Sequence, residues 1–146
     1  MKIIAQNRKA YYNYTIEEEI EAGIMLLGSE VKSIRDGRVN INDAYAAEIK
    51  GEIFLVNSSI SQYKGSNRFN HEVMRQRKLL LHSREMAKIL GKMAQKGYSL
   101  IPLKIYFNKR NIVKILLGMA KGKKLYDKRE SIKKRDEKRS QARGEE

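Results

Sequence analysis

With 146 residues, the chain is long enough for one domain with a hydrophobic core and too short for two domains of ordinary size. Its net charge of +14 favours a protein that binds a polyanion such as RNA; the alternatives are a soluble protein that is merely basic and one that binds an anionic membrane surface. The absence of cysteine excludes disulfides and thiolate chemistry, and the N-terminal segment lacks the apolar stretch of a secretory signal or a membrane span, so we expect a cytoplasmic protein.

The first regular pattern is an alternation. Residues 1–12 are basic and show no periodicity, whereas apolar and polar residues alternate over 14–21, which predicts a half-buried strand. Gly23 is expected to interrupt this strand before it resumes over 24–27. The segment 30–35 then predicts a short helix, because a Gly-Ser pair precedes it and an Asp-Gly pair follows it.

The middle of the chain predicts a hairpin, a loop and a short strand. Residues 43–49 and 53–60 are apolar runs on either side of Lys50-Gly51-Glu52, a spacing typical of a β-hairpin. Residues 62–70 are polar and contain glycine, which indicates a loop. Residues 75–81 pass from basic to apolar and predict a short strand.

An amphipathic helix and a second hairpin follow. Apolar residues recur at helical spacing from Met86 to Ala94, between a serine that favours a helix start and a glycine that favours its end. Residues 99–107 and 112–119 flank a polar turn and predict the hairpin. Pro102, the only proline, lies inside the first of these strands, which suggests an edge position or a bulge.

These segments amount to about six strands and two helices before Gly118. Short strands joined by hairpin turns predict a mainly β fold, a small antiparallel barrel rather than a βαβ fold. Residues 121–146 contain too few apolar side chains to form a core, yet they are rich in helix formers. We therefore expect a β-barrel domain over 1–120 and a basic tail over 121–146 that is disordered alone and helical on a surface of opposite charge.

The stretch GMAKGKK at 118–124 is close to a phosphate-binding loop. Three residues rather than four separate its glycines, and Lys124 stands where a serine or threonine should hold Mg²⁺, so we exclude an NTPase. The glycines and lysines then form either a flexible hinge or, as we favour, a contact with RNA phosphates.

Four carboxylates and two histidines are the other candidates for chemistry. Glu17, Glu18, Glu19 and Glu21 could serve acid–base catalysis or hold Mg²⁺, but a polar outer face of a strand is the favoured interpretation. Glu21 could instead accept hydrogen bonds from nucleobases. Two histidines without cysteine do not make a zinc site, so we expect His71 and His82 at the surface, the latter within reach of RNA.

Basic residues gather near aromatic ones in two further stretches. Residues 68–84 combine five Arg and Lys with Phe69, and residues 7–9 precede a group of tyrosines. Either stretch suits a groove for RNA phosphates and bases. A solvated loop and a segment fixed by tyrosine packing are the alternatives.

Taken together, four stretches of the chain resemble the SsrA-binding protein family, also called small protein B. They are NRKAYYNY at 7–14, EAGIMLLGSEVKSIRDG at 21–37, NRFNHEVMRQRKLLLH at 67–82 and GMAKGKKLYDKRESIKKRD at 118–136. The resemblance implies a closed six-stranded antiparallel barrel of OB-like topology with flanking helices, and no enzyme activity. It also implies no cofactor, metal, membrane or small-molecule substrate, and a monomer.

By the same resemblance, the chain binds the tRNA-like domain of transfer-messenger RNA (tmRNA, SsrA RNA). It would bring that RNA to stalled ribosomes, where the tail enters the empty mRNA path near the decoding centre of the small subunit. The implied RNA-binding residues are Asn7, Arg8, Lys9, Tyr14, Glu21, Arg77, Lys78, Leu80, His82, Lys121, Gly122, Lys123 and Lys124. The implied ribosome-contacting residues are Tyr126, Asp127, Lys128, Arg129, Ile132, Lys134 and Arg135.

The chain departs from the family pattern at two positions of the central stretch and at its end. Val73 replaces a common proline, His82 replaces an asparagine found in some members, and the tail ends in two glutamates. The alternatives are a general OB-type binder of single-stranded RNA, an RNA-processing enzyme that uses the Glu17–Glu21 carboxylates, and a structural protein of the ribosome.

Overall fold

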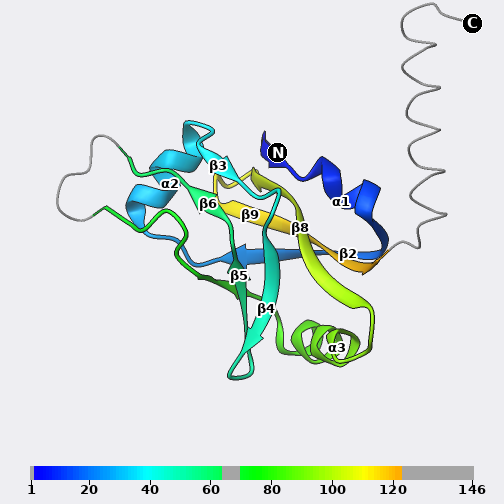
Figure 1. Cartoon of the computed structure of the whole chain (residues 1–146). Coiled ribbons are helices and arrows are strands. Elements are labelled where there is room, and N and C mark those ends of the chain that lie inside the picture. Colours follow the sequence, from blue (N-terminus) through cyan, green and yellow to red (C-terminus); the bar gives the residue numbers. More distant parts are fainter. Residues whose placement is uncertain (1, 64–69, 123–146) are drawn as a thin grey trace, which may run out of the picture.

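The computed structural model describes residues 2–63 and 70–122 (Figure 1). In these ranges the strands are β1 (Lys2–Gln6), β2 (Tyr14–Ile24), β3 (Val39–Asn40), β4 (Tyr45–Ile49), β5 (Glu52–Val56), β6 (Ser59–Ile60), β7 (Arg77–Leu80), β8 (Tyr98–Phe107) and β9 (Val113–Gly122). The helices are α1 (Arg8–Asn13), α2 (Gly28–Arg35) and α3 (Ser83–Met93). The predicted mainly β fold with flanking helices is therefore confirmed.

Antiparallel pairing joins seven strands in the order β1-β8-β4-β5-β7-β2-β9. Strand β8 also pairs with β9. The six strands β8, β4, β5, β7, β2 and β9 therefore form a continuous cycle of paired strands. The first strand lies outside this cycle, on β8, and β3 and β6 form a separate two-stranded sheet. The long strands β2 and β9 lie side by side across the middle of the molecule in Figure 1.

Both predicted hairpins are confirmed. Lys50 and Gly51 connect β4 to β5 with φ angles of 52° and 80°, the left-handed values that a tight hairpin turn requires. The second hairpin pairs β8 with β9 from Tyr98 to Phe107. Its register shifts between Pro102 and Lys104, so the predicted bulge at the proline is also confirmed.

The N-terminal segment is more ordered than its sequence predicted. Residues 2–6 form a strand on β8, and residues 8–13 form a helix. The link between them is Asn7, whose backbone N–H donates to the Leu103 carbonyl at 2.8 Å and whose side-chain amide donates to the Pro102 carbonyl at 3.1 Å. Contacts with the β8 bulge, distant in sequence, thus stabilise a segment that has no periodicity of its own.

The strand that begins at Tyr14 also differs from its prediction. It continues through Gly23 and ends at Ile24, and residues 25–27 are not a strand. A Cβ atom on Gly23 would lie 3.2 Å from the Cβ of Leu80 on the paired strand. The glycine therefore permits a close approach of β2 and β7 and does not interrupt the strand.

The main hydrophobic core joins side chains of the paired strands to side chains of α2 and α3. Its fully buried side chains include Ile34 of α2, Ile53 of β5, Leu79 of β7 and Ile115 of β9. Helix α3 contributes Ile89, as the predicted apolar face requires. No helix in the described ranges is long and apolar enough to span a membrane.

The predictions for the basic tail concern residues on both sides of Gly122, where the described chain ends. Lys121 and Gly122, assigned to the tail, belong to β9. The predictions for Lys123, Lys124 and the residues from Tyr126 to Arg135 lie outside the described residues.

Candidate RNA interface

The start of β2 and the end of β9 lie side by side, next to α1. Strand pairing sets Tyr14 opposite Gly122 and Thr15 opposite Lys121. The residues of this region, Asn7, Arg8, Lys9, Tyr14, Lys121 and Gly122, are here called the terminal corner. Six of the predicted RNA-binding residues thus lie together, although more than a hundred positions separate them in sequence.

The terminal corner presents cations to solvent. Arg8, Lys9 and Lys121 are exposed, whereas Tyr14 is half-buried. The Lys121 ammonium lies 5.6 Å from the ring centre of Tyr98, a distance at which the negative ring face attracts a cation. Tyr98 therefore helps to place a positive charge at the end of β9.

Asn7 has a structural role at this corner. Only 4% of its surface is exposed, and its amide nitrogen and backbone N–H hold the chain to the β8 bulge. Its side-chain oxygen is buried and receives no hydrogen bond from any described residue.

A second group of predicted residues surrounds a depression of about 500 Å³ between β2 and β7. Glu21, Leu80 and His82 line it together with Lys114. All three predicted residues are exposed, so the surface expectation for His82 is confirmed. Tyr106 donates a hydrogen bond from its hydroxyl to the Glu21 carboxylate. Burial, and then this contact with Glu21, raises the pKa of the tyrosine, so the hydroxyl keeps its proton and orients the carboxylate.

Lys78 and Arg77 lie on opposite faces of β7. The half-exposed Lys78 forms an ion pair at 2.8 Å with Glu52 of the neighbouring strand β5. The Arg77 side chain is fully buried, so it offers no surface to an RNA phosphate in this conformation. Arg77 therefore lies away from the predicted RNA face and makes a structural contact in the interior.

That contact is with Glu30 of α2, whose side chain is also fully buried. The Arg77 Nε donates to one carboxylate oxygen at 2.5 Å, and an Arg75 Nη donates to the other at 2.6 Å. The backbone N–H of Leu27 donates to the carboxylate at 2.8 Å. Burial alone would raise the pKa of Glu30, but these hydrogen bonds outweigh burial and hold the pKa below its usual value.

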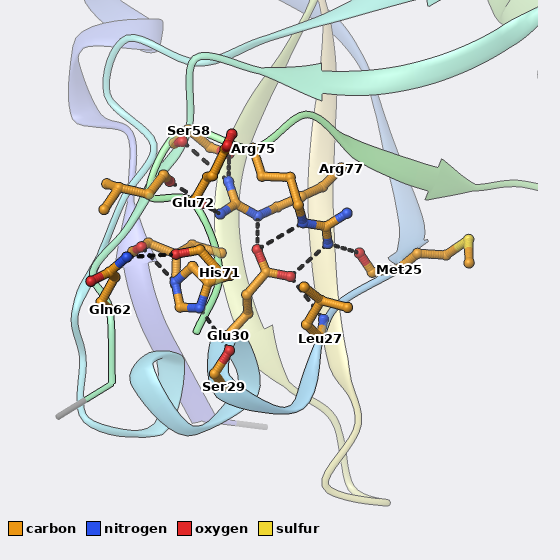
Figure 2. Close-up of polar contacts among 12 residues, drawn as sticks. Met25, Leu27, Ser29, Glu30, Ser58, Gln62, His71, Glu72, Arg75 and Arg77 are labelled. Carbon is orange, nitrogen blue, oxygen red and sulfur yellow. Dashed lines mark hydrogen bonds and ion pairs between the residues drawn. The ribbon is translucent and has the colours of Figure 1, made fainter. Parts of the chain in front are cut away.

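The rest of the Arg77 guanidinium is hydrogen-bonded to the chain around it. It donates to the Ser58 hydroxyl at 3.0 Å and to the Val73 carbonyl at 3.1 Å. The position that departs from the family pattern, Val73, thus provides a backbone oxygen to this network. Glu30 and Arg77 tie together α2, β7 and the segments around residues 58 and 73, as Figure 2 shows.

His71 is buried, with 3% of its surface exposed, so the expectation that it is a surface residue is wrong. Its two ring nitrogens lie 2.8 Å from the Ser29 hydroxyl and 2.8 Å from the Ile60 carbonyl (Figure 2). A histidine with both nitrogens occupied can be buried without an unsatisfied polar group. The ring holds the segment that begins at residue 70 against α2.

The acidic stretch on β2 has a separate partner for each carboxylate. Glu17 contacts Tyr98 and Lys92, and Glu18 forms an ion pair with Lys88 at 2.9 Å. Within residues 2–63 and 70–122, no group of three or more His, Asp or Glu side chains is placed to hold a metal ion. This arrangement agrees with the polar outer face favoured above, and it ties β2 to α3.

Sequence reasoning missed Tyr106 and Glu30, and it counted Arg75 among the basic residues of 68–84 without its partner Glu30. A signal for Glu30 was present, because a glutamate three residues after a helix N-cap can accept the N-cap backbone N–H, as it does from Leu27. Tyr106 lies in a predicted strand, but only the pairing of β8, β9 and β2 brings its hydroxyl to Glu21.

The fold and these surfaces define a class: a small, mainly β protein with two exposed groups of cationic, aromatic and hydrogen-bonding residues. Comparison with known proteins makes the assignment specific. The family described as "SmpB protein" matches residues 4–145, and the chain belongs to this family.

Relatives and a solved structure agree with that assignment. The chain is 60% identical to the SsrA-binding protein of Orientia tsutsugamushi (strain Ikeda) and 58% identical to that of Rickettsia canadensis (strain McKiel), in each case over 97% of this chain and 93% of the relative. It also matches a chain of the solved structure described as "tmRNA-SmpB: a journey to the center of the bacterial ribosome", with a TM-score of 0.70 and 46% identity. That match covers 88% of this chain and 93% of the other.

Proposed function

We propose that this protein binds the tRNA-like domain of tmRNA and delivers it to stalled ribosomes, so that incomplete peptides are tagged for degradation. The observation that carries the proposal is the agreement in sequence and fold, over nearly the whole chain, with SsrA-binding proteins and with a chain of a tmRNA–SmpB structure. The terminal corner and the β2–β7 depression supply a chemistry that suits RNA.

The terminal corner neutralises phosphates. Arg8, Lys9 and Lys121 are exposed cations on adjoining elements, and Lys123 and Lys124 continue the basic stretch in sequence. Backbone-directed contacts of this kind fix the register of an RNA without reading its bases.

The β2–β7 depression reads the RNA more closely. A carboxylate oriented by a tyrosine hydroxyl accepts hydrogen bonds from base N–H groups, and Glu21 is such a carboxylate. Leu80 offers an apolar contact beside it, and His82 a ring that stacks or hydrogen-bonds. The protein acts by binding and positioning, without catalysis.

The cycle of paired strands supports a closed, six-stranded barrel of OB-like topology over residues 1–120. In this proposal, the barrel takes the place of missing tRNA parts and presents its RNA partner to the ribosome. The basic tail over 121–146 enters the empty mRNA path, where a helix would present Tyr126, Asp127, Lys128 and Arg129.

Deleting residues 125–146 tests this division of labour. The terminal corner and the depression would remain, so affinity for the tRNA-like domain should change less than about threefold, whereas peptide tagging on stalled ribosomes should be abolished. Filter binding and a reconstituted tagging reaction provide the two measurements. Parallel loss of binding and tagging would contradict the proposal that the tail acts only on the ribosome.

A further inference from the structure

A separate pocket lies where α1 faces the segment that precedes β4. Its volume is about 340 Å³, at the lower end of the range of about 300–1,000 Å³ typical of small-ligand sites. The residues that matter here are Asn7, Lys9, Tyr14, Asn42, Asp43 and Tyr45. None of the six lines the β2–β7 depression. Asn7, Lys9 and Tyr14 belong to the terminal corner, whereas Asn42, Asp43 and Tyr45 belong to no predicted RNA-binding stretch.

Hydrogen bonds fix both walls of this pocket before any ligand binds. Asn7 is held on the β8 bulge by its backbone N–H and its amide nitrogen. On the other wall, Asn57 donates to the Asp43 carbonyl at 3.1 Å, and the backbone N–H of Asn42 donates to the Asn40 side chain at 2.8 Å. A site with fixed walls loses little conformational entropy when it binds a ligand.

Two hydrogen-bond acceptors of the lining residues have no donor among the described residues. The Asn7 side-chain oxygen is one of them, but it is buried and offers no surface to a ligand. No described residue donates to the exposed Asp43 carboxylate either, and no described cation forms an ion pair with it. The exposed Asp43 carboxylate therefore favours a ligand whose facing edge carries hydrogen-bond donors.

The charges and the aromatic residues of the pocket further restrict the class of ligand that it can bind. Lys9 and Asp43 contribute one positive and one negative charge, so the pocket does not select an anion such as a free phosphate. Two of the lining residues are aromatic, Tyr14 and Tyr45, and Tyr45 is 47% exposed. Aromatic rings beside neutral hydrogen-bonding groups are typical of sites that stack a single unpaired base.

We propose that this pocket binds one unpaired guanine base of the RNA, with Asp43 as the residue that selects it. Guanine is the one standard RNA base with two adjacent donors, N1–H and the exocyclic amine, on its pairing edge, and a carboxylate accepts from both. Adenine and cytosine set a ring acceptor beside their amine, which a carboxylate repels. Lys9 lines the same pocket, and in this proposal its ammonium donates to the guanine O6 or N7 acceptor.

This inference rests on the proposed RNA-binding function, and the experiment separates the two. The probes are short, fluorescently labelled, single-stranded RNAs of adenosines that carry one central guanosine or one central inosine, which lacks the exocyclic amine. Fluorescence anisotropy with the full chain at one fixed salt concentration gives the affinities. The tRNA-like domain of tmRNA is measured on the same preparations.

We expect the wild-type protein to bind the guanosine probe about tenfold more tightly than the inosine probe, within the range for a paired hydrogen-bond contact. Asp43→Asn should bind the two probes alike, because an amide no longer offers two acceptors. Asp36→Asn, the same change at an exposed aspartate of the α2 end, is the matched control and should keep the preference.

Equal wild-type affinity for the two probes, or a preference that survives in Asp43→Asn, would overturn the guanine pocket. If the tRNA-like domain still binds tightly in that case, the proposed function stands without the pocket. Weak binding of the tRNA-like domain would instead contradict the proposed function.

Discussion

Arg77 and Lys78 are neighbours in sequence with opposite positions in the structure. Successive side chains of a strand point to opposite faces, so one of the two had to face inward. The alternation did not show which one, because Arg77 is buried against Glu30, 47 residues away in sequence, and no local signal joins them. A run of basic residues is therefore a poor guide to an RNA face until the partner of each charge is known.

Glu30 offers the sharpest test of this buried contact. Changing Glu30 to Gln should lower the free energy of unfolding at pH 7 by roughly 3–5 kcal/mol, because Arg77 then keeps a buried charge without a counterion. Denaturant unfolding measures the change. Glu52→Gln, which breaks the half-exposed pair with Lys78, is the control and should cost less than about 1 kcal/mol.

The same residue predicts a pH dependence. Because the pKa of Glu30 is lowered in the folded protein, its contribution to stability is complete above the unfolded value of about 4.5 and is lost as the pH falls further. The wild type should therefore lose more stability than Glu30→Gln between pH 6 and about pH 3. Identical pH profiles for the two proteins would show that the carboxylate is not held ionised by Arg75 and Arg77.

At the scale of elements, β2, β8 and β9 meet at a glycine. A Cβ atom on Gly118 would lie 2.9 Å from a methyl of Leu103 and 3.2 Å from a methyl of Ile16. Gly118 lies opposite Glu19 of β2 on one side and Ile101 of β8 on the other. Because β9 is hydrogen-bonded to both strands here, a shift of either one to make room for a Cβ atom would disturb its pairing with β9. The bulge after Pro102 places Leu103 at this junction.

Gly118→Ala should therefore lower the free energy of unfolding by about 1–3 kcal/mol, the usual cost of forcing extra volume into a packed site. The matched control is Gly122→Ala in the same strand, where an added Cβ meets no atom within 4 Å. Thermal unfolding of both variants provides the measurement. Equal stability of the two would mean that the three strands are less tightly packed at this junction than the distances indicate.

Elements whose signals are local were predictable from the sequence, and elements held by distant contacts were not. Turn residues and alternation fixed both hairpins and the start of β2, and helical spacing fixed α3. The strand and helix at residues 2–13 depend on the contact between Asn7 and the β8 bulge, so their sequence alone shows no pattern. Gly23 was misread because a glycine that permits close strand approach and a glycine that ends a strand look alike in sequence.

For the molecule as a whole, pairing of distant strands creates the surfaces on which the proposed function depends. The β2–β9 ladder brings the start of β2 and the end of β9 to the terminal corner, and the β2–β7 contact forms the depression with Glu21, Leu80 and His82. Three of the thirteen predicted RNA-binding residues differ from the others that the structure describes, because Asn7 and Arg77 are buried and Lys78 forms an ion pair with Glu52. The exposed members lie on two separate surfaces, which suits a folded RNA better than a single extended strand.

The most direct test of the proposed function is competition between two RNAs for the full-length protein: the tRNA-like domain of tmRNA and an unstructured RNA of equal length. The affinities are measured over a series of salt concentrations, and both should fall as salt screens the cation–phosphate contacts. A plot of the logarithm of the binding constant against the logarithm of the salt concentration should steepen by about one unit for each phosphate neutralised. We predict that the tRNA-like domain stays bound at least about a hundredfold more tightly throughout. Equal affinity for the two RNAs would contradict the account and identify a general binder of single-stranded RNA.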